Sequence, residues 1–180
     1  DTSYVWGVVG NNSLIDTNII KNAIITLHLI TKFYNNKYIN DVALGANAIT
    51  LLGANFEIVN NIFTLISTGI GSNGSYAGRT SLKINQNTFN ISGGIAAAIS
   101  LVDSFVSGQA NEIKNNIIQN TDTLSTVDAA AILINNNSAD IEENIIKTTT
   151  DISLRHIAVL FTTNSNLATF NIKRNVIRSA

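Results

Sequence analysis

Hydrophobic and polar residues alternate along this chain in very short stretches. A small residue followed by alternating aliphatic residues is typical, as in Ala48–Leu51. Alternation with a period of two is characteristic of β-strands that bury one face. Comparable stretches lie at Trp6–Val9, Ala98–Leu101, Ala131–Ile134 and Ala158–Phe161. This pattern predicts an all-β protein built from many short strands.

A second pattern, Ile-x-x-Asn-x-(Ile/Phe), follows these stretches and recurs along the whole chain. Its central residues are Asn18, Asn61, Asn87, Asn116, Asn144 and Asn175. From Asn61 onward the spacings are 26, 29, 28 and 31 residues, whereas the first interval is 43 residues. The long interval indicates either a degenerate coil or an insertion, and we expect irregular segments near 31–42 and 69–80.

Repeats of this length that can bury their apolar face only against their neighbours predict a solenoid. Strands stacked about 4.8 Å apart would join the Ile, Leu and Phe side chains into one apolar column. Each motif Asn belongs at a tight bend, because Asn tolerates the left-handed conformation and can bond the nearby backbone. In register, the six Asn would form an internal hydrogen-bonded ladder. We therefore expect about six coils, in which the Asn residues have a structural role.

The Ile-x-x-Asn-x-(Ile/Phe) coil resembles the repeat of the pectate-lyase-like superfamily of right-handed parallel β-helices. This superfamily includes polysaccharide lyases and hydrolases, phage tailspikes and autotransporter passenger domains. The segment Asn87–Ala96 is similar to the Phe-x-x-Asn and Gly-Gly-Ala-Ile motifs of polymorphic outer-membrane proteins, with Ser92 in place of Asn and Ile95 in place of Ala. The resemblance implies a right-handed parallel β-helix over residues 1–180, as one segment of a longer protein.

Composition narrows the possible partners. The 180 residues carry a formal net charge of -1 and only 13% are charged, which argues against nucleic acid because phosphates require clustered Lys and Arg. No stretch approaches the roughly 20 apolar residues of a membrane span. The chain has no Cys, so disulfides and thiolate metal sites are excluded.

Candidate catalytic chemistry is sparse. Glu142 and Glu143 are adjacent, and neighbours along a strand point to opposite faces, so we expect solvated positions rather than a shared cleft. The sequence has no Gly-x-Ser-x-Gly elbow, phosphate-binding loop or metal-spaced His cluster. We predict no catalytic residue, no metal ligand and no cofactor.

Aromatic residues concentrate in the segment 31–42, and the Gly-rich segment 69–80 has one more; these aromatic residues are the candidate binding residues. These are Phe33, Tyr34, Tyr38 and Tyr76. Loops on a rigid solenoid carry binding, and aromatic faces are what sugar or protein partners stack on. The alternative is that these rings pack inside the stack.

Two functions fit these observations. The first is a structural and binding β-helix of a secreted or surface-exposed bacterial protein, similar to an adhesin or autotransporter passenger, with a host-surface protein or glycan as its partner. The second is a carbohydrate-active β-helix, lyase, hydrolase or tailspike-like, whose cleft is absent or lies outside this segment. At the solenoid ends we expect further coils of the same chain or another copy. A groove with three or more carboxylates, or an Arg/Lys–Asp set, would favour the enzyme.

Overall fold

The protein was analysed as a computed structural model. The structure describes residues 5–9, 12–28, 31–42, 47–53, 55–66, 68–73, 81–92, 97–102, 110–120, 129–135, 138–148, 156–162 and 169–179. These residues form 21 β-strands and no helix. Each coil contributes three strands in succession, one to each of three sheets, and each sheet contains seven strands among the described residues.

Sheet A contains β1 (Val5–Val9), β4 (Ala23–His28), β7 (Ile49–Leu52), β10 (Ile70–Asn73), β13 (Ile99–Val102), β16 (Ala129–Asn135) and β19 (His156–Thr162). Sheet B contains β2 (Ser13–Asp16), β5 (Thr31–Tyr34), β8 (Asn55–Val59), β11 (Ser81–Asn85), β14 (Ala110–Lys114), β17 (Ala139–Glu142) and β20 (Phe170–Lys173). Sheet C contains β3 (Ile19–Lys21), β6 (Lys37–Asn40), β9 (Ile62–Leu65), β12 (Thr88–Ile91), β15 (Ile117–Asn120), β18 (Ile145–Thr148) and β21 (Val176–Ser179).

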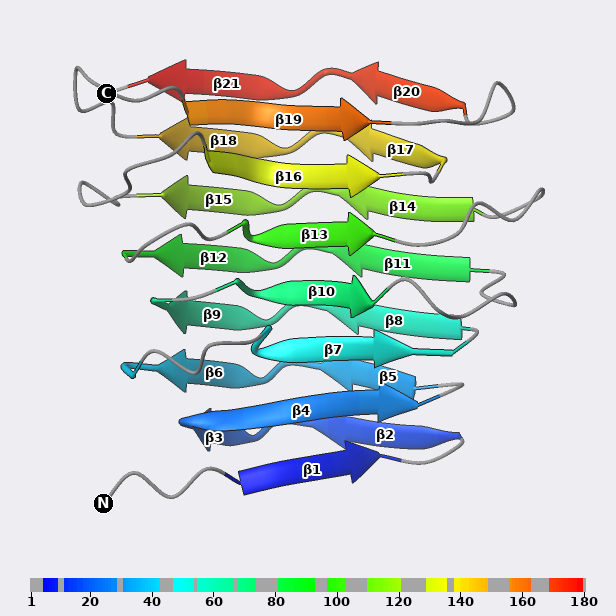
Figure 1. The fold of residues 1–180 in the computed structure, drawn as a ribbon, viewed down its shortest axis with the longest axis vertical. Helices are drawn as coiled ribbons and strands as arrows, with labels where there is room; N and C mark the ends of the chain where they lie inside the picture. Colours follow the sequence, from blue (N-terminus) through cyan, green and yellow to red (C-terminus); the bar gives the residue numbers. More distant parts are fainter. Residues whose placement is uncertain are drawn as a thin grey trace.

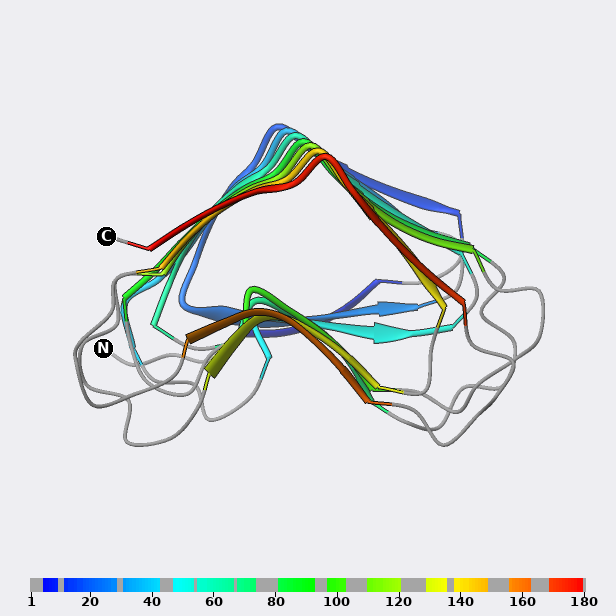
Figure 2. The same cartoon turned by 90° about the horizontal axis from the view of Figure 1, so that it is seen from above.

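The strands stack in parallel as a right-handed β-helix, which confirms the predicted fold. Figure 1 shows the coils rising from β1 to β21, with each strand lying over its counterpart in the coil before. Viewed along the stack, the three sheets enclose a roughly triangular cross-section with a sharp corner between sheets B and C (Figure 2). The described residues make seven coils, one more than the number of Ile-x-x-Asn-x-(Ile/Phe) motifs.

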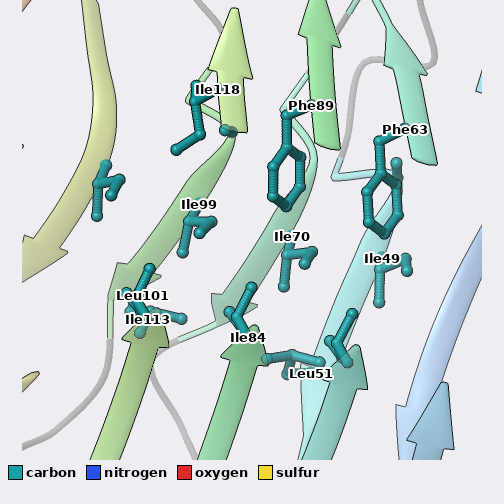
Figure 3. Packing of buried hydrophobic residues seen from close by; sticks show 14 of the residues in the cluster. Ile49, Leu51, Phe63, Ile70, Ile84, Phe89, Ile99, Leu101, Ile113 and Ile118 are labelled. Atoms are coloured by element: carbon teal, nitrogen blue, oxygen red, sulfur yellow. The ribbon is translucent and has the colours of Figure 1, made fainter. Parts of the chain in front are cut away.

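The core is a set of inward columns, one residue per coil. In sheet A the column Ile49, Ile70, Ile99 and Ile132 is in register and buried. Figure 3 shows the first three of these isoleucines facing Phe63, Phe89 and Ile118 of sheet C across the interior. Each fully buried side chain of this size contributes about 1.5–3 kcal/mol relative to an exposed one. The predicted in-and-out alternation is therefore the basis of the fold's stability.

An asparagine ladder runs along the corner between sheets B and C. In each link, the backbone N–H and the side-chain amide of one Asn both donate to Oδ1 of the Asn in the next coil. For Asn87 and Asn116 these distances are 2.9 and 3.1 Å. The same amide also donates to a carbonyl in the preceding coil, as from Asn87 Nδ2 to Ile58 O at 2.8 Å. The six predicted ladder residues Asn18, Asn61, Asn87, Asn116, Asn144 and Asn175 all take part.

The residue before each ladder Asn makes the bend. Its φ is positive in every coil, between 53° and 60°. Asn, which tolerates this left-handed region best after Gly, occupies three of the positions, whereas the others carry less suited side chains. The full set is Thr17, Asn35, Asn60, Gln86, Asn115, Glu143 and Arg174. The left-handed residue is thus the neighbour of the ladder Asn and not the ladder Asn itself.

The segment 31–42 is a regular coil and not an insertion. β5 and β6 pair in register with the strands on both sides, and Asn36 occupies the ladder position between Asn18 and Asn61. The segment Phe33–Tyr38 has the motif spacing with aromatic residues in place of Ile. Bulky rings fit here because the Tyr38 column in sheet C continues into Phe63 and Phe89, and the Phe33 ring in sheet B stacks on Phe63 across the interior. The apparent gap of 43 residues thus contains one further coil.

The segment 69–80 was also expected to be irregular, but its first part is the strand β10. Gly71 stands in the outward column of sheet A, and a Cβ there would lie 2.0 Å from Asn47 Nδ2, so the Asn47 side chain covers this position. Ser72 takes an inward position, and its Oγ accepts a hydrogen bond from the Val102 N–H at 3.0 Å. Because these small residues stand where other sheet A strands have larger side chains, the alternating aliphatic pattern that predicts those strands is absent here. Residues 74–80 lie outside the described part of the chain.

Candidate functional site

Two of the four predicted binding residues belong to the core. Phe33 and Tyr38 are both 0% exposed, and their rings pack against Phe63 with centroids 6.4 and 5.9 Å away. Phe63 in turn stacks on Phe89 at 4.8 Å with nearly parallel rings. The prediction that Phe33 and Tyr38 contact a partner is therefore wrong: they pack inside the stack because they occupy inward positions of a regular coil.

The hydroxyl of Tyr38 is satisfied inside the protein. It donates to Ala23 O and lies 3.3 Å from Ala48 O, both at the start of sheet A strands. Burial raises the pKa of this phenol well above its ordinary value of 10.0. Tyr38 thus joins sheet C to sheet A across the interior and has no group left for a ligand.

Tyr34 lies on the outside of sheet B, as a binding residue requires, but it is only half-exposed. Its hydroxyl donates to Glu57 Oε2 in the next coil. Burial, followed by the hydrogen bond to Glu57 and the charge of Glu57, raises the pKa of Tyr34 to about 12. Tyr34 remains a candidate for partner contact, whereas Tyr76 lies outside the described residues.

The outer face of sheet B carries the largest group of charged side chains in the described residues. Two outward columns contribute, in register along the stack. We call the following residues the charged face: Lys32, Glu57, Lys83, Glu112, Asp140, Lys114, Glu142 and Lys173. This face could not be predicted from the sequence, because the charges are about 25 to 30 residues apart in the chain and meet only when the coils are in register.

Opposite charges alternate along most of the charged face. Lys83 pairs in register with Glu57 on one side and Glu112 on the other. Glu142 lies 3.8 Å from Lys114 Nζ and 4.0 Å from Lys173 Nζ. Ion pairs at a protein surface contribute about 0–1 kcal/mol each, so these pairs mainly arrange a defined charge pattern on the outer face.

Glu142 and Glu143 lie closer together than the strand pattern predicted. The Arg174 guanidinium contacts both, at 3.3 Å from Glu142 Oε2 and 2.8 Å from Glu143 Oε1. Glu143 does not continue the strand, since its φ of 58° turns the backbone at the corner. Both carboxylates are therefore on the outer surface, paired with one arginine.

Sheet C presents a different surface. Its first outward column is mainly branched and apolar, with Ile62, Thr88, Ile117, Ile145 and Val176 in consecutive coils. Ile62 and Val176 are among the exposed large hydrophobics. The second outward column of sheet C is mainly polar and includes Lys21, Lys147 and Arg178.

Sheet A is uncharged on its outward column, where Thr26, Thr50, Gly71, Ser100, Leu133 and Leu160 are in register. Sheet B therefore differs from the other two sheets in carrying charges of both signs along two columns.

The described residues contain no group of three or more His, Cys, Asp or Glu side chains placed to hold a metal ion. No helix long and apolar enough to cross a membrane occurs among them either. In comparisons with known proteins, no family model, curated protein or solved structure matches this chain. The candidate site is therefore defined by the outer faces alone, with the charged face as its most specific feature.

Proposed function

We propose that this chain is a structural and binding segment of a secreted or surface-exposed bacterial protein in the pectate-lyase-like superfamily, similar to an adhesin or an autotransporter passenger. Its partner would be a host-surface protein or glycan. The chain would act as a rigid rod that displays its outer faces to an extended partner.

The observation that supports this proposal best is the combination of the continuous ladder with chemically distinct faces. The ladder links Asn18 to Asn175 without a break, so the coils are held in register from end to end. Register turns scattered residues into ordered columns with a spacing of about 4.8 Å. A partner that contacts several coils would recognise such a column through many weak contacts at once.

A binding experiment tests the proposed role. The purified chain is applied to host cells, untreated or pretreated with protease or glycosidase, and bound chain is quantified. We expect saturable binding that one pretreatment abolishes, and a loss of binding when Lys83→Glu reverses a charge in the middle of the charged face. Thr50→Glu on neutral sheet A is the matched control. Antibody labelling of intact bacteria that produce the protein tests the location; absence of both surface labelling and cell binding would refute the proposal.

One observation favours the carbohydrate-active alternative. Glu112 and Asp140 are side by side in adjacent coils on the charged face, next to Lys83 and Lys114. Glycoside hydrolysis uses two carboxylates across one bond, and a lyase needs a base near a sugar acid. Asp140, however, already accepts a hydrogen bond from Asn171 Nδ2 at 2.7 Å.

Activity on a panel of acidic and neutral polysaccharides tests this alternative. If the enzyme hypothesis is correct, reducing ends or unsaturated products accumulate with the wild-type chain and are abolished by Glu112→Gln. Glu57→Gln, two coils away in the same column, is the matched control. Absence of products from every substrate would reject catalysis by this segment.

A further inference from the structure

Charged residues are distributed unevenly among the three sheets. The sheet C strands contain Lys21, Lys37, Lys147 and Arg178, but no Asp or Glu. The sheet A strands contain no Lys, Arg, Asp or Glu, and the sheet B strands contain both signs. The formal net charge of -1 argues against an anionic partner for the chain as a whole, but it does not describe sheet C, whose charges are all positive.

The four cationic side chains of sheet C stand in its outward columns and are exposed. Lys21 pairs with Asp41, which follows β6, at 3.2 Å. Lys37, Lys147 and Arg178 make no ion pair within the described part of the chain. Three positive charges on this face are therefore left for an anion outside the protein.

Branched aliphatic side chains lie between these cations. Ile62 is 47% exposed, and Ile117 and Ile145 are half-buried in the same outward column. Lys37 and Lys147 are four coils apart, which corresponds to roughly 19 Å along the stack. Sheet C forms one nearly straight side of the triangular cross-section in Figure 2, so these side chains project from a common plane.

We propose that the outer face of sheet C docks on a bilayer surface that contains anionic phospholipids. The aliphatic column would lie at the level of the headgroups, and the Lys and Arg side chains would contact lipid phosphates. A compact anion cannot reach Lys37 and Lys147 together, whereas mobile headgroups can move to each of them. Within the described strands, sheet C has no outward aromatic ring on which a sugar could stack, so a lipid surface fits this face better than a polysaccharide does.

This docking goes beyond the proposed function and does not depend on it. Sheets B and C meet at a sharp corner, so a chain that lies on sheet C turns its charged face away from the lipid (Figure 2). The contact uses outward side chains only. Coils stacked beyond β3 or β21 would lengthen the sheet C face and leave it open.

Co-sedimentation with lipid vesicles tests the role of charge. Vesicles of phosphatidylcholine mixed with phosphatidylglycerol should bind the chain, and vesicles of phosphatidylcholine alone should bind far less. Added salt should weaken the binding, because it screens exposed charges. Lys147→Gln should lower the partition coefficient about fivefold, which is the contribution of one basic residue near an anionic surface. Lys83→Gln, on sheet B, is the matched control and should leave the coefficient unchanged.

A second pair of variants tests the aliphatic column. Ile62→Ser should lower the partition coefficient at least about threefold, because about half of this side chain is exposed and would leave water on docking. Leu14→Ser is the matched control, since Leu14 is 62% exposed on the outer face of sheet B. It should leave vesicle binding unchanged. Circular dichroism checks that every variant keeps the fold.

The orientation of the bound chain can be measured because the sequence contains no Cys. An environment-sensitive dye attached to Thr64→Cys on sheet C should shift to shorter wavelength on anionic vesicles, and the same dye on Thr50→Cys of sheet A should not. A wild-type chain that does not bind anionic vesicles would overturn the proposal. So would equal losses from Lys147→Gln and Lys83→Gln, or binding of a soluble acidic polysaccharide that requires Lys147 in a chain that ignores vesicles.

Discussion

Asn36 donates its backbone N–H and its side-chain amide to the same atom, Asn61 Oδ1, at 2.8 and 3.1 Å. This double contact carries the ladder through the coil that has Phe33 and Tyr38 in place of Ile. Asn36 and Asn61 are almost fully buried, with 2% and 1% of their surfaces exposed. A buried amide is stable only when its donors and acceptors are satisfied, and the ladder satisfies each Asn through its neighbours in the stack.

Replacing one central ladder residue should destabilise the whole solenoid. Asn116 Nδ2 donates to Ile84 O at 2.7 Å and to Asn144 Oδ1 at 2.9 Å, and its Oδ1 accepts from Asn87. Asn116→Ala leaves these buried groups unpaired and should lower the free energy of unfolding by about 2–4 kcal/mol. Urea denaturation measures this loss.

The control for that prediction is Asn90→Ala, in the outward column of β12. It should change the unfolding free energy by less than about 0.5 kcal/mol, as surface substitutions generally do. Equal effects of the two substitutions would mean that the ladder has no special role in stability.

Substitutions at Tyr38 test whether the aromatic residues of the coil 31–42 belong to the core or to a binding surface. Tyr38→Phe keeps the ring and removes the hydroxyl that donates to Ala23 O, so it should cost about 1–3 kcal/mol. Tyr38→Ala also opens a cavity and should cost about 3–5 kcal/mol. Both are measured by thermal and urea unfolding; an unchanged stability in either variant would contradict the buried placement.

Gln86 tests the backbone bend before the ladder. It is exposed and has a φ of 60°, a region where Asn is better tolerated than Gln. Gln86→Asn should therefore raise the free energy of unfolding by about 0.5 kcal/mol. Gln119→Asn, on strand β15, should give no gain, because Asn is disfavoured in strands. A gain at Gln119 and none at Gln86 would refute the explanation.

Asp41 should titrate below an ordinary aspartate. A hydrogen bond with the Asn22 side chain, and then Lys21, lower its pKa from 3.8. Its folded pKa is depressed, so its contribution to stability is present above pH 4 and is lost as the pH falls through the folded pKa. Carboxyl NMR titration should show the midpoint rising in Asn22→Gly and less in Lys21→Ala. Lys37→Ala is the control and should leave the midpoint unchanged.

The solenoid could be predicted from the sequence because its determinants are local and repeated. Each Ile-x-x-Asn-x-(Ile/Phe) motif contains two inward residues and the ladder residue at fixed spacing, so stacking follows from the motif alone. The coil at 31–42 does not match the motif because Phe33 stands where the other coils have Ile. It fits a broader motif that accepts any large apolar residue at the positions of Phe33 and Tyr38.

The charged face could not be predicted in the same way. Lys83 and Glu112 are 29 residues apart, and they become neighbours only through the register of β11 with β14. That register depends on the lengths of the turns between the strands, which vary from coil to coil. The prediction that Phe33 and Tyr38 contact a partner was wrong for a related reason. Whether a side chain points into the core or out to solvent depends on how its strand pairs with the neighbouring coils.

The central claim is that a continuous asparagine ladder holds the coils in register. The most direct test is NMR detection of scalar couplings across hydrogen bonds, from the backbone nitrogen of each ladder Asn to the side-chain carbonyl carbon of the next. We predict a correlation from Asn36 to Asn61, from Asn61 to Asn87 and from Asn87 to Asn116. Absence of these correlations, together with rapid exchange of the same backbone amides, would contradict the ladder and the seven-coil fold built on it.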